Sequence, residues 1–245
     1  MTRLVVAELF KLRTTRTFAA VVGAGVGLLL LILVLTLALT DSFSTEDDIR
    51  SLLSSASICG LFMLILGVVA GAGEYRHGTI ASTLLVTPDR LRAVGAQTLG
   101  VAAAGLSVGL ACVVLSAAIC LPWLSAKGAA TLSTGDLIAL FAGCAVYTGL
   151  AAGFGVALGA LLRNQVAAVV VVLVFLFVVD PAIAALVDEY GQFSLSGLAS
   201  AISGGSPEDA PGSELLPQGV AVLIWAGYTV VVALAAALLT ARRDV

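Results

Sequence analysis

A serine set between two glycines is the first arrangement in this chain whose residue types could do chemistry. Ser107 lies between Gly105 and Gly109, the G-x-S-x-G spacing in which a strained turn exposes a nucleophile. Such a serine needs a nearby base, and the sequence has one histidine, His77, in a distant polar segment. Ser107 instead lies within a long apolar run, where glycine and serine allow helices to approach closely. The spacing therefore does not predict a hydrolase.

Phosphate and metal chemistry find no matching pattern either. A phosphate-binding loop needs a lysine after a glycine-rich turn, and neither Lys11 nor Lys127 stands in such a setting. The cysteines lack paired spacing and neighbouring histidines, so we interpret them as small core residues rather than metal ligands or disulfides. They are Cys59, Cys112, Cys120 and Cys144. The chain is therefore expected to be no enzyme by itself, with no catalytic, cofactor or metal residues.

Asp180 is the carboxylate embedded in an apolar stretch, followed directly by Pro181. Counting from Arg163, 17 residues at about 1.5 Å each place Asp180 about 25 Å across a membrane, near its outer boundary. Two interpretations stay open there. Asp180 is either a structural cap, with Pro181 bending the helix, or part of an outer gate that contacts substrate. An ion-coupled carrier or channel would need several such groups.

The composition of the chain indicates that these residues belong to a membrane protein. Of the 245 residues 60% are hydrophobic and 11% are charged, and the mean hydropathy is +1.12. Soluble domains are about 45–50% apolar and about 25% charged. The net charge of −3 gives no support for nucleic-acid binding.

Six apolar runs are each long enough to cross about 30 Å of hydrocarbon as a helix. Their residues do not alternate with polar ones, which excludes a barrel and predicts an all-α integral membrane protein with a single domain over 1–245. We expect Pro122 and Trp123 to end the third run. The predicted spans are 18–40, 52–73, 97–122, 137–162, 164–187 and 217–241.

The distribution of basic residues predicts the orientation. Ten of the 12 Lys and Arg residues lie in the two terminal segments and in the loops that follow the second and fourth spans. Arg50 and Lys127 are the other two, and the opposite loops collect acidic residues. Because positive charge accumulates on the cytoplasmic side, both termini of this multi-pass protein are expected there.

The segment before the first span, residues 2–16, has helical amphipathic spacing. Apolar positions share one side, and charged positions lie opposite: Val5, Val6, Leu9 and Leu12 against Arg3, Glu8 and Lys11. An amphipathic helix at the inner membrane interface would suit both faces and contact lipid head groups. The alternative is that these residues only lengthen the first span inwards.

The inner loop after the second span, residues 73–92, is the most patterned loop. Thr79 can cap a short helix, and Pro88 ends it, which predicts a helix over 78–87. Leu84 and Leu85 would place apolar groups on a polar loop. They indicate either a docking surface for another protein or side chains that dip into lipid. On the other side, the long segment 188–217 predicts a short helix that dips between the spans or lies on the surface.

The order of these features resembles that of ABC-2 type transporter permeases, over essentially the whole chain. The most specific part of the resemblance is the loop, with E-x-x-x-G-T followed by Leu-Leu, Pro and Arg: Glu74, Gly78, Thr79, Leu84, Leu85, Pro88 and Arg90. The N-terminal segment supports it through Glu8, Lys11 and Leu12. The coupling loop typical of importers fits less well, so the resemblance favours export.

The resemblance implies a bacterial plasma-membrane exporter subunit whose inner loop couples to a separate ATPase. The coupling residues would be those of the loop together with Arg76 and His77, and the connecting helix beneath the spans would carry Glu8, Lys11, Leu12, Arg13 and Arg16. Two ATPase chains would bind Mg-ATP, this chain would bind no cofactor, and a second permease chain, identical or related, would complete the complex.

The cargo is expected to be apolar or amphipathic, such as a drug, antibiotic, peptide or lipid, because the spans are apolar and carry few charges. Two alternatives stay open, an ion-coupled carrier or channel and a membrane scaffold or sensor that transports nothing.

Overall fold

The computed structural model describes residues 2–40, 43, 45–76, 90–128, 132–205 and 215–242. Within these ranges every regular element is helical, and six helices are long and apolar enough to cross a membrane. The expected all-helical architecture with six long apolar helices is therefore confirmed. These helices are Arg16–Leu39, Glu46–Glu74, Arg92–Lys127, Thr134–Leu162, Gln165–Leu186 and Gln218–Leu239.

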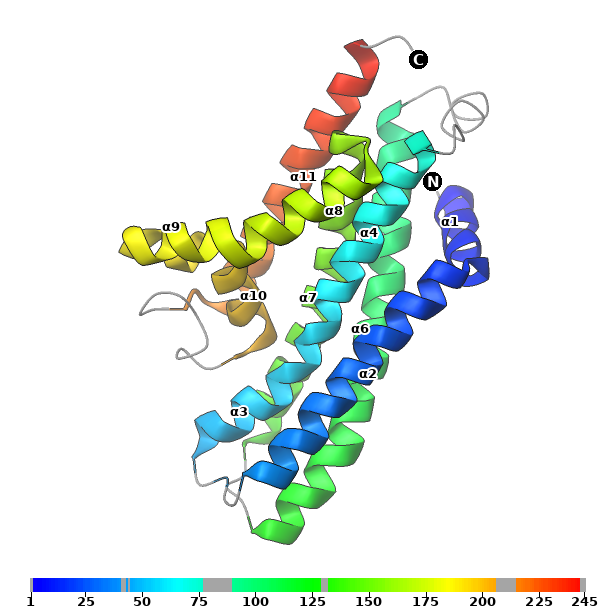
Figure 1. Ribbon diagram of the computed structural model, residues 1–245. Helices are drawn as coiled ribbons and strands as arrows, with labels where there is room; N and C mark the ends of the chain where they lie inside the picture. The colour runs from blue at the N-terminus through cyan, green and yellow to red at the C-terminus, as the bar shows by residue number, and fades with distance from the viewer. Residues whose placement is uncertain are drawn as a thin grey trace.

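Several of these stretches are divided into shorter elements, and Figure 1 shows their arrangement. The η2 element is a π-helix, whereas η1 and η3 are 3-10 helices. In chain order the elements are α1 (Thr2–Thr14), α2 (Arg16–Leu39), α3 (Glu46–Ser54), η1 (Ser55–Ser57), α4 (Ile58–Arg76), α6 (Arg90–Lys127), α7 (Thr134–Leu162), α8 (Gln165–Val174), η2 (Phe175–Val179), α9 (Asp180–Leu186), η3 (Asp188–Phe193), α10 (Leu195–Ser203) and α11 (Gln218–Arg242).

Helix α7 is the centre of the bundle and packs against α4, α6, α10 and α11. Its contact with α4 is made by glycines spaced four residues apart, Gly67 and Gly71 on α4 and Gly155 and Gly159 on α7. A Cβ atom at any of the four would meet a carbonyl oxygen of the facing helix. The two main chains are therefore in direct contact, as small residues at this spacing permit.

Gly23 and Gly27 share the same spacing on α2, but they do not pair in this way. A Cβ atom at either position would meet nothing within 4 Å among the described residues. Both glycines lie on an outward face of α2, because its buried residues are Gly25, Leu29, Leu33 and Leu37.

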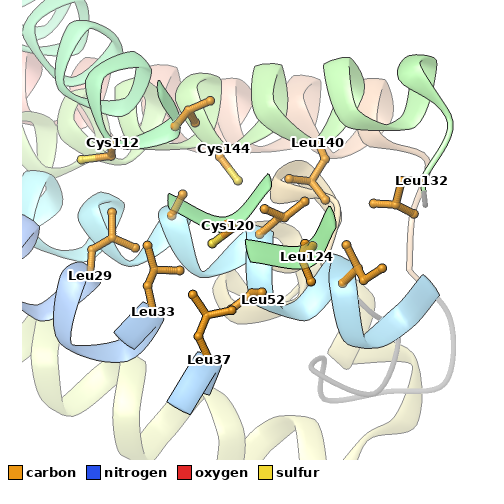
Figure 2. Packing of buried hydrophobic residues seen from close by; sticks show 14 of the residues in the cluster. Leu29, Leu33, Leu37, Leu52, Cys112, Cys120, Leu124, Leu132, Leu140 and Cys144 are labelled. Atoms are coloured by element: carbon orange, nitrogen blue, oxygen red, sulfur yellow. The ribbon is translucent and has the colours of Figure 1, made fainter. Parts of the chain in front are cut away.

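A core of leucines and cysteines fills the half of the bundle that contains α3 and the start of α7 (Figure 2). Leu29, Leu33 and Leu37 recur every four residues along α2 and point at this core. All four cysteines are buried and free, as expected of small core residues. The Sγ atoms of Cys59 on α4 and Cys112 on α6 lie 2.9 Å apart.

The N-terminal helix α1 is separate from α2. Thr15 between them has an extended backbone, with φ −89° and ψ 125°, and its hydroxyl donates to the carbonyl of Lys11 at 2.7 Å. The interpretation that residues 2–16 only lengthen the first span is therefore wrong. Leu12 is buried in a cluster with Met63 and Val101, so this part of the apolar face of α1 packs on α4 and α6 rather than facing lipid.

The third span departs from its predicted end, because α6 continues through Pro122 to Lys127. Proline has no N–H to donate within the helix, and the Ser125 hydroxyl donates to the Pro122 carbonyl in the following turn, 2.8 Å away. The Lys127 ammonium lies over the Trp123 ring, 5.6 Å from its centre. These local contacts stabilise the final turns.

The fifth span is one helical path of three segments, α8, η2 and α9. The π-helical turn of η2 directly precedes Asp180 and Pro181. The wider turn accommodates the proline ring, which clashes with the carbonyl four residues earlier in a regular helix. In Figure 1 the α9 end of this path stands clear of the bundle and lies beside α10.

Candidate functional site

An ionic cluster joins α1 to the last turn of α4. The Lys11 ammonium donates to a carboxylate oxygen of Glu74 at 2.8 Å and lies 3.7 Å from the carboxylate of Glu8 one turn earlier. Glu74 is 9% exposed, so a carboxylate that is costly to bury is stabilised by a cation from another helix. Two of the three members come from the N-terminal segment.

The surroundings of the cluster shift the titration of its members. Partial burial raises the pKa of the Glu8 carboxyl, an effect that the nearby Lys11 ammonium opposes. Burial acts to lower the pKa of Lys11, but the hydrogen bond to Glu74 and the attraction of both carboxylates outweigh it, and the net shift is upward. Lys11 is therefore a fixed positive charge at this junction.

A cavity of about 430 Å³ adjoins the cluster, with walls from α1, α2, α4, α6 and α8. Arg76 at the end of α4 donates to the side-chain oxygen of Gln165 at the start of α8, 3.0 Å away. Gln97 on α6 donates to the carbonyl of Ala70 on α4 at 3.3 Å. The end of α4 is thus connected by polar contacts to α1, α6 and α8.

The structure brings together only part of the predicted coupling interface. Glu74 and Arg76 lie at the end of α4, with Glu8, Lys11 and Leu12 close by on α1, and Arg16 is exposed at the start of α2. Arg13 and Arg90 are helical, and their side chains lie outside the description. The remaining loop residues and the helix predicted over 78–87 lie outside the described residues: His77, Gly78, Thr79, Leu84, Leu85 and Pro88.

At the start of α9 the Asp180 carboxylate is fully buried and accepts four hydrogen bonds. Its donors are the Tyr190 hydroxyl at 2.8 Å, the Leu195 main-chain N–H at 3.2 Å, and both the N–H and the hydroxyl of Ser196, at 3.1 and 2.6 Å. Asp180 therefore caps the first turn of α10, where a helix presents unpaired N–H groups and positive partial charge. Pro181 is the next residue and is exposed. A gating role for either residue stays a prediction.

The predicted short helix of the outer segment is present as α10, and its far end is also held. The Gln218 side-chain amide donates to the carbonyls of Ile202 on α10 and Ala139 on α7, at 2.7 and 3.0 Å. Gly143 permits this approach, since a Cβ atom there would meet the Ile202 carbonyl. Helix α10 thus packs against α7 and α11 within the bundle rather than on its surface.

Sequence reasoning missed three residues of this arrangement, Tyr190, Ser196 and Gln218. Gln218 is an isolated polar residue at the start of an apolar run, a signal that it has a hydrogen-bonding task within the bundle. Tyr190 and Ser196 gave no signal, because their partner Asp180 is identified only by the fold.

Comparison with known proteins leaves the family of the chain open. No protein-family profile matches it, and no curated protein matches it.

Proposed function

We propose that the chain is the membrane-spanning permease subunit of an ATP-driven ABC exporter of the ABC-2 type. It would export an apolar or amphipathic cargo outward, with ATP hydrolysis in a separate subunit and with both termini in the cytoplasm. The observation that carries the proposal is the contact between Lys11 and Glu74. It supports a mechanical role because it fixes the N-terminal helix to the end of α4, directly before the loop that resembles a coupling helix.

The mechanism follows from how the end of α4 is held. Force applied to the 77–89 loop by a closing ATPase would reach α4 and α6 directly through the chain. It would reach α1 through Lys11 and α8 through the contact between Arg76 and Gln165. Packed helices respond to such a load as rigid bodies, which is the kind of movement that alternating access requires.

An ion-coupled carrier receives less support from the outer carboxylate. A coupling acid must exchange its partners with an ion or proton during transport. The Asp180 carboxylate instead accepts hydrogen bonds from four donors and thereby caps helix α10. This arrangement suits a permanent structural role.

The deciding experiment is purification of the tagged chain from its native operon in mild detergent, followed by ATP hydrolysis and transport assays. We expect an ATPase subunit to co-purify. Leu84→Asp with Leu85→Asp is expected to abolish its retention or its coupling to transport, because two charges replace an apolar docking surface. Ser82→Asp with Thr83→Asp adds the same charge to the same loop and is the matched control. A chain that purifies alone, or a double leucine variant that behaves as wild type, contradicts the proposal.

A further inference from the structure

A second, apolar cavity of about 560 Å³ lies among four of the six candidate spans. Its lining includes Phe154 and Leu158 of α7, Val171 of α8 and Val231 of α11. The η3 segment and the start of α10, both held by Asp180, close another side. The walls therefore belong to the part of the chain that crosses the hydrocarbon layer.

The chemistry of the lining restricts the occupant to hydrocarbon. All lining side chains are leucine, valine or phenylalanine except two tyrosines. The Tyr190 hydroxyl donates to Asp180 at 2.8 Å, and the Tyr228 hydroxyl donates to the Phe193 carbonyl at 3.3 Å. Neither tyrosine has a proton left to donate, so an acceptor group of a ligand buried here would lose its hydrogen bonds to water without replacement.

The cavity is lined by exposed residues of both α8 and α11, and we infer that it opens between these two helices. Val171 and Val231, which flank this opening, are 51% and 66% exposed. Both helices turn most of their apolar surface outward, since only 17% of the most apolar stretch of each candidate span is buried. In a membrane the opening therefore faces lipid chains directly.

We propose that this cavity binds one acyl chain of a membrane lipid, which enters between Val171 and Val231. A helix of a second protein chain fits the space less well. With its side chains a helix is about 10–12 Å wide, so 560 Å³ holds little more than one helical turn. A flexible hydrocarbon chain fills such a volume without leaving main-chain groups unpaired.

A tryptophan whose fluorescence can report on the cavity lies next to it. Trp225 is 1% exposed, and its ring lies 5.7 Å, edge to face, from the ring of Phe154 in the cavity wall. The sequence has two tryptophans, and the other, Trp123, is 45% exposed at the far end of α6. In the Trp123→Phe protein all tryptophan fluorescence comes from Trp225.

The test measures quenching of Trp225 in vesicles of phosphatidylcholine with brominated acyl chains, against unbrominated vesicles. We expect quenching of this buried indole, and loss of that quenching when Val171→Phe fills the opening. Val170→Phe is the matched control, because Val170 is the preceding residue, 53% exposed, and outside the lining. Val231→Phe with Val230→Phe as its control repeats the comparison from α11.

Absence of quenching, or equal quenching in the lining and control variants, overturns the inference. A protein partner in the cavity would give the first of these results. The measurement needs neither ATP nor an ATPase, so its failure leaves the proposed exporter function untouched, and failure of that function leaves the lipid site standing.

Discussion

Lys11 and Glu74 are 63 residues apart in the chain, and their side chains meet at 2.8 Å. The carboxylate is largely buried while the ammonium is half exposed. Solvent therefore screens one side of the pair. The contact positions α1 against α4 more than it stabilises the fold.

A double-mutant cycle with Lys11→Met and Glu74→Gln measures this contact. We expect a coupling energy of about 1 kcal/mol in thermal unfolding, since exposed pairs give less and buried pairs more. Glu8→Gln serves as the control and is expected to change stability less, because its carboxylate lies 3.7 Å from Lys11. Additive single effects would show that the two groups do not interact.

Removal of the Asp180 carboxylate should release α10. Asp180→Ala leaves two main-chain N–H groups and two hydroxyls without their acceptor, and we expect a loss of about 3 kcal/mol or more. Asp180→Asn keeps one acceptor oxygen and should cost less. Thermal unfolding in detergent orders the variants, and an alanine variant as stable as wild type would exclude the capping role.

The glycine contact between α4 and α7 predicts a steep positional dependence for alanine substitutions. Gly71→Ala and Gly155→Ala each add a Cβ against a main-chain oxygen, which cannot move aside, and should destabilise by about 1–3 kcal/mol or prevent folding. At Gly23 and Gly27 an added Cβ meets no other described residue, so alanine there should be neutral or stabilise by up to about 1 kcal/mol. Yield and thermal stability compare the two pairs, and equal effects at all four sites would refute the packing.

The cysteine pair of the outer core offers a cross-linking test. With Sγ atoms 2.9 Å apart, Cys59 and Cys112 should form a disulfide when a membrane-permeable copper complex is added as oxidant. Digestion should then yield one peptide containing parts of α4 and α6, separated by reduction. Cys59→Ser is the control without a cross-link. If both thiols stay open to alkylation after oxidation, α4 and α6 are not neighbours at this level.

The phenol of Tyr190 should lose its proton at a higher pH than an ordinary tyrosine. Burial, followed by the hydrogen bond to the Asp180 carboxylate, raises the pKa of its phenol to about 12 from an ordinary value of 10. The folded protein then holds this proton more tightly than the unfolded chain. Its contribution to stability is complete below pH 10 and is lost as the pH rises from 10 to about 12. Ultraviolet titration of wild type against Tyr190→Phe checks this, and a phenolate that forms near pH 10 contradicts it.

The sequence predicted the helices well because apolar runs of about 20 residues permit little else in a membrane. The sequence did not decide whether the helix breaks at Thr15, between α1 and α2. That break depends on threonine hydroxyls that bond to the preceding turn. The third span was expected to end at Pro122, whereas the helix continues to Lys127, because a proline costs a helix one hydrogen bond without having to end it.

The sites were predictable only where partners lie close in sequence. Counting residues placed Asp180 toward the outer boundary, but its donors follow 10 to 16 residues later and meet it through a reversal of the chain. The pairing of Lys11 with Glu74 requires the whole packing of α1 beneath the bundle. Neither the period of the hydrophobic pattern nor the spacing of residues predicts which side chains from distant helices will pair.

The glycine seam between α4 and α7 also determines which parts of the molecule can shift. Two main chains in contact cannot slide by a fraction of a turn without collision, so α4 and α7 move together as one rigid body. By contrast, α2, the α8–α9 path and α11 each bury only 17% of their most apolar stretch. These three segments are the parts of the bundle that can move relative to the α4–α7 rigid body. Conformational strain in this protein should therefore collect at their hinges, Thr15 and the π-turn of η2, and leave its centre undeformed.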